Sequence, residues 1–150
     1  MREGVTIKQP KEFELIAKGG KKLCHILDRL CRAVKPGVTT EELDVMAERM
    51  IRDAGGEPAF KGYRPRPDHP SFTTTICCSL NSEVVHAPAV PSRMVKDGDL
   101  VKIDIGMKWL AERESGMKNL ESGGLYTDTA VTVCVGKCSK AARRLMEATE

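Results

Sequence analysis

In the stretch LVKIDIGM (Leu100–Met107), apolar residues alternate with charged residues and a glycine. Alternation with a period of two predicts a β-strand that has one face in the core. A second long strand, rich in Val and Thr, is predicted over Leu125–Val135. If the two strands pair as a hairpin, the carboxylates of Asp104 and Asp128 can share one face of the sheet and converge.

Two converging carboxylates raise an electrostatic question. Asp104 stands between two isoleucines, and burying its charge is costly unless a cation compensates. Close carboxylates also repel, so that one of them is protonated or a cation lies between them. The alternative is a pair of aspartates beside a turn or in salt bridges. Spacing alone leaves both interpretations open.

Two amphipathic helices are predicted before these strands. Residues 11–34 carry apolar side chains at helical spacing, and Pro36-Gly37 ends this helix. Thr39 and Glu42 form a capping box that starts the second helix. Its apolar stripe consists of Leu43, Met46, Ala47, Met50, Ile51 and Ala54, and Gly55-Gly56 ends it.

The remaining elements are shorter. Gly62–Ser71 contains three prolines and is predicted to be a loop. Strands are expected at Thr73–Leu80 and Glu83–His86, and Ser139 is expected to cap a last helix. The residues that suit a core face of this helix are Ala141, Leu145 and Met146. The predicted class is therefore α+β, with amphipathic helices packed on an antiparallel sheet.

Composition excludes several classes of protein. The 150 residues are 41% hydrophobic and 30% charged, which fits one globular domain. Since no apolar run approaches the ~20 residues of a membrane span and no signal peptide starts the chain, membrane and secreted proteins are excluded. The balance of 24 Lys and Arg against 21 Asp and Glu gives no reason to expect DNA binding.

Nine of these basic residues, against four acidic ones, lie in residues 1–35. We interpret them as a solvated helix face, with docking to RNA as the alternative.

Six cysteines occur without a CxxC motif or a secretion signal. Most of them are expected to be reduced, buried thiols of a cytosolic protein. A nucleophilic role for Cys77 or Cys78 beside His86 is disfavoured, because buried thiols on strands are usually inert.

Five motifs, taken in order, resemble the type I methionine aminopeptidases. They are PGVTTEELD (Pro36–Asp44), PAFKGY (Pro58–Tyr63), NSEVVHAP (Asn81–Pro88), DGDLVKIDIG (Asp97–Gly106) and YTDTAVTV (Tyr126–Val133). The resemblance implies a creatinase-like "pita-bread" fold, in which two similar halves surround a curved antiparallel sheet. It also implies cytoplasmic removal of the initiator methionine from nascent polypeptides.

The same resemblance implies roles for individual residues. Asp104 matches the ligand of one metal ion, Asp128 the ligand that bridges two, and His86 the histidine that contacts the substrate beside the scissile amide. The positions that match the methionine pocket are Tyr63, Phe72 and Cys77. The implied cofactor is a pair of divalent ions, for which Co, Mn, Fe and Zn all suit the ligand types.

The sequence departs from the family pattern in two ways. The remaining His and both Glu ligands of the family lie in a C-terminal half that these residues lack. The chain is therefore expected to be the N-terminal part of one catalytic domain, and the isolated 150 residues to be inactive. In addition, Asp104 and Asp128 are 24 positions apart, more than in the family. Because Gly106–Leu110 recurs with one change as Gly116–Leu120, we expect a duplicated hairpin tip, with Trp109 exposed there or packed over the rim of the site.

Two other functions compete with the aminopeptidase. One is a non-catalytic member of the same fold that binds protein or RNA near the ribosome. The other is a related metallopeptidase directed at proline. A buried carboxylate pair argues against the first, and the NSEVVHAP motif favours methionine specificity over the second.

Overall fold

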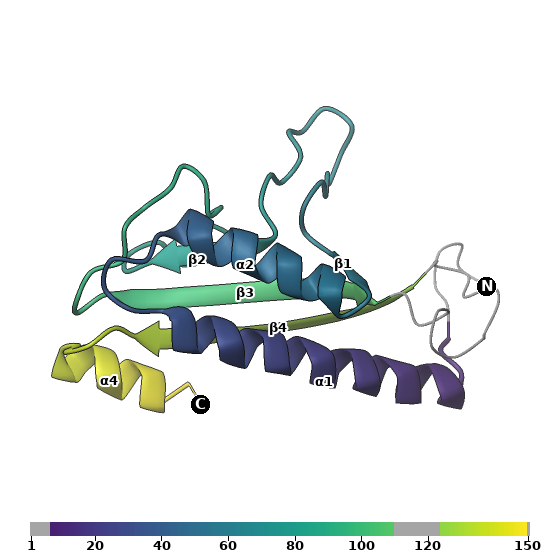
Figure 1. The fold of residues 1–150 in the computed structure, drawn as a ribbon, viewed down its shortest axis with the longest axis horizontal. Coiled ribbons are helices and arrows are strands. Elements are labelled where there is room, and N and C mark those ends of the chain that lie inside the picture. Colours follow the sequence, from purple (N-terminus) through teal and green to yellow (C-terminus); the bar gives the residue numbers. More distant parts are fainter. Residues whose placement is uncertain (1–6, 110–123, 150) are drawn as a thin grey trace.

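The computed structural model describes residues 7–109 and 124–149, and Figure 1 shows their arrangement. Three helices are present in this part of the chain: α1 (Pro10–Ala33), α2 (Thr40–Asp53) and α4 (Lys140–Glu147). The four strands are β1 (Gly56–Pro58), β2 (Ile76–Leu80), β3 (Leu100–Trp109) and β4 (Leu125–Cys134). The predicted α+β class is confirmed. None of the described helices is both long and apolar enough to span a membrane.

Strand β3 is the centre of an antiparallel sheet. β4 pairs along one edge of β3 over its whole length, from Leu100 opposite Cys134 to Trp109 opposite Leu125. β1 and β2 share the other edge, with β2 at the start of β3 and β1 at its end. The predicted pairing of the two long strands is therefore confirmed.

Helices α1 and α2 cover one face of this sheet, α1 against β4 and β3 and α2 against β1 and β2 (Figure 1). The alternating residues of β3 point into the layer between sheet and helices, where Val101, Ile103, Ile105, Met107 and Trp109 are all buried. The capping box of α2 is present, since Thr39 Oγ1 accepts from Glu42 N (3.2 Å) and the Glu42 carboxylate accepts from Thr39 N (2.8 Å). Local sequence signals thus place both helices correctly.

The position expected for Trp109 is wrong. Its side chain is 1% exposed, in the core at the end of β3 rather than on a tip or over the site. Gly19 of α1 provides the space, because a Cβ there would lie 3.2 Å from the indole. Lys22 adds a cation–π contact at 5.2 Å. The expected duplicated tip itself lies outside the described residues.

Two secondary-structure predictions also need correction. Glu83–His86 is not a strand, because the Glu83 carboxylate accepts from Leu80 N (2.7 Å) and closes a turn, and His86 has a φ of +60°. The last helix exists and Ser139 caps it, but its expected core face is wrong. Ala141 and Leu145 are exposed and Met146 is half-buried. The apolar pattern predicts an amphipathic helix, but it does not predict which other element covers the apolar face.

The cysteines divide into two groups. Cys77 and Cys78 are free and buried, as expected, whereas Cys24 is free but exposed. Cys134 and Cys138 form a disulfide between the end of β4 and the start of α4. The expectation of reduced, buried thiols is wrong for Cys134 and Cys138. Their CxxxC spacing gave no sign of the disulfide.

Candidate functional site

The two aspartates lie on the sheet face opposite α1 and α2. Asp104 pairs with Ala130, and Asp128 pairs with Gly106. The carboxylates are therefore diagonal neighbours on one face, a relationship that typically separates Cα atoms by about 7–8 Å. The predicted sharing of one face is confirmed. Asp104 is half-buried and Asp128 is exposed.

A cavity of about 610 Å³ opens above these carboxylates. All six residues that the family resemblance singled out contribute to its lining, although they come from the β1–β2 loop, β2, the loop after β2, β3 and β4. The lining residues are Phe60, Tyr63, Pro65, Pro70, Ser71, Phe72, Cys77, His86, Asp104 and Asp128.

The apolar wall of the cavity comes from the loop between β1 and β2. Gly62 N donates to Phe72 O and Phe72 N donates to Tyr63 O, both at 2.8 Å, so that the base of the loop is tied together. The Phe60 and Phe72 rings meet edge to face with centroids 6.4 Å apart. Gly106 lets this wall approach the sheet, because a Cβ there would lie 2.6 Å from Phe60. The loop therefore brings Phe72 into the cavity.

His86 enters the cavity from the loop after β2. Its backbone is in the left-handed region, with φ at +60°, a conformation that persists only where neighbouring contacts hold it. Those contacts are two hydrogen bonds at Ala87: Cys78 N donates to its carbonyl (2.9 Å), and its N–H donates to Ser79 Oγ (3.2 Å). The loop is thus fastened to β2 directly after the histidine.

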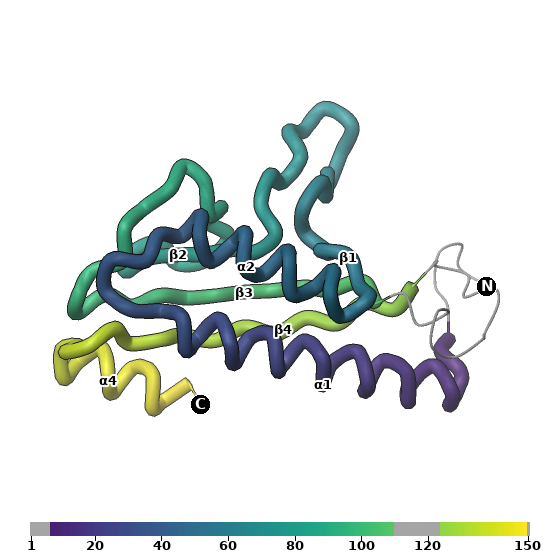
Figure 2. The backbone as a smooth tube through the Cα atoms, in the orientation of Figure 1, coloured from purple at the N-terminus to yellow at the C-terminus, as the bar shows by residue number. Residues whose placement is uncertain are grey.

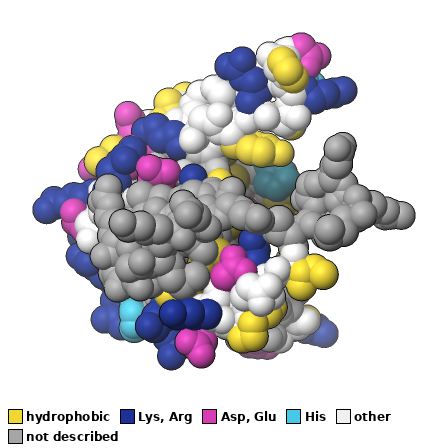
Figure 3. Space-filling view, turned by 90° about the vertical axis from the view of Figure 1, so that its right-hand side faces the viewer, with side chains coloured by type: hydrophobic (Ala, Val, Ile, Leu, Met, Phe, Trp, Pro, Cys, Tyr) yellow, Lys and Arg dark blue, Asp and Glu magenta, His cyan; other side chains and the backbone are white. Residues whose placement is uncertain are grey.

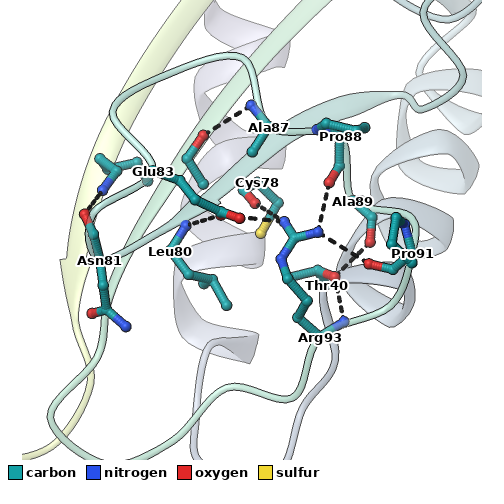
Figure 4. A network of polar contacts seen from close by, with 12 residues as sticks. Thr40, Cys78, Leu80, Asn81, Glu83, Ala87, Pro88, Ala89, Pro91 and Arg93 are labelled. Atoms are coloured by element: carbon teal, nitrogen blue, oxygen red, sulfur yellow. Dashed lines mark hydrogen bonds and ion pairs between the residues drawn. The ribbon is translucent and has the colours of Figure 1, made fainter.

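Arg93 fastens the same loop from the other side (Figure 4). Its guanidinium donates to the carbonyls of Cys78 (2.6 Å), Pro88 and Pro91 (both 3.0 Å), and it lies 3.5 Å from the Glu83 carboxylate. One side chain therefore joins β2 to three points of the segment that carries His86. Sequence reasoning missed Arg93, because nothing in its local pattern distinguishes it from a surface arginine.

Two residues of the PGVTTEELD motif position the site from α2. The buried Asp44 carboxylate accepts from Thr75 N (2.7 Å) and Ile76 N (2.9 Å) and so fixes the start of β2. Burial raises the pKa of Asp44, and these two hydrogen bonds counteract the shift. Thr40 Oγ1 donates to Ala89 O (2.5 Å) and accepts from Arg93 N (3.0 Å). The PGVTTEELD motif marked this segment as important in the sequence. It did not show which distant residues Thr40 and Asp44 contact.

The electrostatics of the cavity floor favour a cation. Burial, and then the negative charge of Asp128, raise the pKa of Asp104, while His86 lowers it. Asp104 Oδ1 is inaccessible to solvent and has no hydrogen-bond partner among the described residues. An unpaired carboxylate oxygen beside a second carboxylate fits the preference of divalent cations for oxygen ligands. The described residues contain no group of three or more His, Cys, Asp or Glu that could hold a metal ion, so the two aspartates form an incomplete ligand set.

Cys77 lies beside Asp104 in the sheet, since the two residues are register partners of β2 and β3. Burial, followed by the charges of Asp104 and Asp128, raises the pKa of Cys77 to about 12. A protonated thiol is a poor nucleophile, which argues further against cysteine chemistry with His86. Cys77, His86 and Asp104 also line a second cavity of about 400 Å³ that extends toward α4. They form the boundary between the two spaces.

Residues 14–150 match Metallopeptidase family M24. The chain belongs to this family. Membership of M24 implies the use of a metal ion, in agreement with the chemistry of the cavity floor. The chain is similar to methionine aminopeptidase 1 of Bacillus subtilis (36% identity over 147 residues) and to the methionine aminopeptidase of Aquifex aeolicus (32% over 146 residues). These alignments cover 97% of this chain but 51% and 52% of the relatives. The M24 chain thus spans about half the length of the curated relatives it matches.

Solved structures show the fold of this M24 chain. The crystal structure of the Thermotoga maritima methionine aminopeptidase superposes with a TM-score of 0.79 at 28% identity, over 97% of this chain and 51% of that one. The prolidase of Pyrococcus horikoshii, at 17% identity and a TM-score of 0.70, shares the fold. The expected pita-bread fold is confirmed, and this chain corresponds to about half of the Thermotoga maritima structure.

Proposed function

We propose that the complete protein is a methionine aminopeptidase and that these 150 residues are the N-terminal part of its single catalytic domain. The observation that carries the proposal is the cavity, in which two carboxylates, a histidine and an apolar wall meet at the positions that match the family's motifs. The named relatives, matched along nearly the whole chain, support the same activity. The carboxylate pair in this cavity argues against the competing non-catalytic binding module.

Asp104 and Asp128 are proposed to hold two divalent ions, with Asp128 bridging them. The unpaired Asp104 oxygen is the first binding position, and the exposed Asp128 carboxylate has oxygens free for a shared role. Co, Mn, Fe and Zn all suit such ligands. When bound, a metal pair polarises the peptide carbonyl and activates water for hydrolysis. The remaining ligands are expected from the half of the domain that this chain does not include.

The other residues of the cavity are proposed to bind the substrate. Tyr63, Phe72 and the neutral Cys77 thiol give the methionine side chain an apolar surface with a polarisable sulfur contact. The free α-amino group of the substrate is proposed to lie beside Asp104 and Asp128, which restricts binding to polypeptide N-termini. His86, held in place by its loop, can donate or accept a hydrogen bond at the amide nitrogen that leaves.

The substrates are proposed to be nascent polypeptides in the cytoplasm, and α1 is proposed to dock on ribosomal RNA. Residues 1–35 carry the basic excess, and the exposed basic side chains of α1 are Lys11, Lys18, Lys21, Arg29 and Arg32. Cosedimentation of the complete protein with ribosomes tests this contact. Binding is expected to weaken steeply as salt is raised, and undetectable cosedimentation at low salt would contradict it.

Hydrolysis of a Met-Ala-Ser peptide by the complete protein tests the proposed activity. We expect turnover that is lost after chelation and restored by one of the four metals. Asp104→Asn is expected to abolish turnover, whereas the control Asp53→Asn, exposed on α2, should leave it unchanged. The isolated 150 residues should be inactive, because two carboxylates leave each ion short of ligands. A complete, metal-loaded protein that cleaves no Met-Ala peptide would refute the proposal.

A further inference from the structure

The loop between β1 and β2 projects from the sheet away from α1 and forms the outer lip of the 610 Å³ cavity (Figure 2). Pro65 and Pro70 line the cavity, so the residues between and beside them stand at its mouth. Internal contacts keep this lip in shape: His69 N donates to Arg66 O (3.0 Å), and Arg64 Nη1 donates to Pro67 O (3.4 Å). Three prolines stiffen it further.

The lip carries two guanidinium groups against one carboxylate, that of Asp68, and all three are exposed. Arg64 and Arg66 are exposed, and neither forms a salt bridge with any carboxylate in the described part of the chain. Arg66 instead donates to His69 Nε2 (2.9 Å). Lys61, at the base of the same loop, is different, since Glu48 pairs with it at 2.6 Å. In Figure 3, Lys and Arg side chains lie at the top of the molecule, where the loop projects, with an acidic side chain among them.

Carboxylates and guanidinium groups thus stand at opposite ends of the cavity. Asp104 and Asp128, the proposed metal ligands, line the floor, whereas Arg64 and Arg66 flank Pro65 on the lip and, with Asp68, leave it a net positive charge. An extended polypeptide whose N-terminus reaches the floor advances by about 3.3 Å per residue, so a path out past the lip brings its third to fifth residues near the loop. The two arginines flank Pro65, which lines the cavity.

We propose that Arg64 and Arg66 form a specificity subsite that favours polypeptides with Asp or Glu at the third to fifth positions from the N-terminus. This inference rests on the proposed aminopeptidase activity and adds a determinant downstream of the methionine pocket. Guanidinium groups bind carboxylates through paired hydrogen bonds, and the stiff loop holds them ready. Because both groups are exposed, the preference is modest and falls with salt.

Two peptide series with the complete protein test the subsite. The first compares hydrolysis of Met-Ala peptides that carry one Glu or one Gln at positions three, four or five. The second measures binding of the same peptides with a reduced first bond, which cannot be hydrolysed, by fluorescence anisotropy. At low salt we expect the better-placed Glu peptides to be favoured about fivefold in kcat/KM and in affinity, with the preference lost near about 1 M salt.

The charge-reversed variant R64E/R66E is expected to favour the Gln peptides over the Glu peptides, so that the preference inverts. The matched control R49E/K96E, which changes two exposed basic residues outside the cavity, should keep the preference for Glu. Equal hydrolysis and binding of Glu and Gln peptides by an active enzyme would overturn the subsite and leave the proposed function standing. Preferential binding of Glu peptides without any hydrolysis would support the subsite and contradict the proposed function.

Discussion

Replacing Arg93 with methionine should loosen the loop that positions His86. The substitution removes three hydrogen bonds to carbonyl oxygens, those of Cys78, Pro88 and Pro91. Each is partly open to solvent, so we assign about 1 kcal/mol to each, or about 3 kcal/mol in total. Arg93 Nε is buried without a partner among the described residues, and removing it returns about 1 kcal/mol. The net loss of unfolding free energy is thus about 2 kcal/mol, roughly thirtyfold in the folding equilibrium.

Urea unfolding of the complete protein, followed by circular dichroism, measures this loss as a shift of the midpoint at constant slope. Arg49→Met is the matched control, because the Arg49 side chain is 83% exposed and should change the free energy by less than about 0.5 kcal/mol. Peptide hydrolysis by Arg93→Met should show a reduced kcat at unchanged metal content. Superimposable unfolding curves, or a normal kcat in the destabilised variant, would refute the role assigned to Arg93.

Three further predictions concern the core, the thiols and the hairpin. Trp109→Ala should cost about 3–5 kcal/mol, measured by urea unfolding, because the indole is fully buried, and a loss under 1 kcal/mol would contradict its core position. Iodoacetamide at pH 8 should modify exposed Cys24 roughly a thousandfold faster than Cys77, because burial raises the pKa of Cys77 to about 12. Mass spectrometry of digests measures the two rates, and equal rates in the folded protein would disprove the burial of Cys77. Deleting Leu110–Asn119 shortens the separation of the two site aspartates by ten, leaves five residues between the paired ends of β3 and β4, and keeps Trp109. The shortened complete protein should retain metal and activity, and loss of both in a folded protein would make the segment part of the site.

The sequence predicts well those elements whose structure is determined by residues close together in the chain, through a repeating pattern or a local cap. The capping box at Thr39 and the alternation in β3 act between neighbours, so they survive in the fold. The shared face of Asp104 and Asp128 follows from the same alternation, since an even register offset keeps both side chains on one side. Strand β1, with three residues that include Gly56 and Pro58, has no such period and was not predicted.

The features that the sequence did not predict depend on contacts between distant segments. Trp109 is buried because Gly19, ninety positions earlier, leaves room for it. The left-handed backbone of His86 depends on Arg93 and on hydrogen bonds to β2. The Cys134–Cys138 disulfide requires the chain to turn back after β4. Motif matching found the site residues without these contacts, but it could not explain what holds them.

Metal content is the most direct measure of the central claim that Asp128 bridges two ions while His86 acts on the substrate. The complete protein, its Asp128→Ala and His86→Ala variants and the control Asp53→Ala would be gel-filtered and analysed by plasma mass spectrometry. We expect two ions per chain in the wild type, in the control and in His86→Ala, which should lose turnover only. Asp128→Ala should lose most of its metal. Full metal occupancy in Asp128→Ala, or an empty site in His86→Ala, would contradict the assignment.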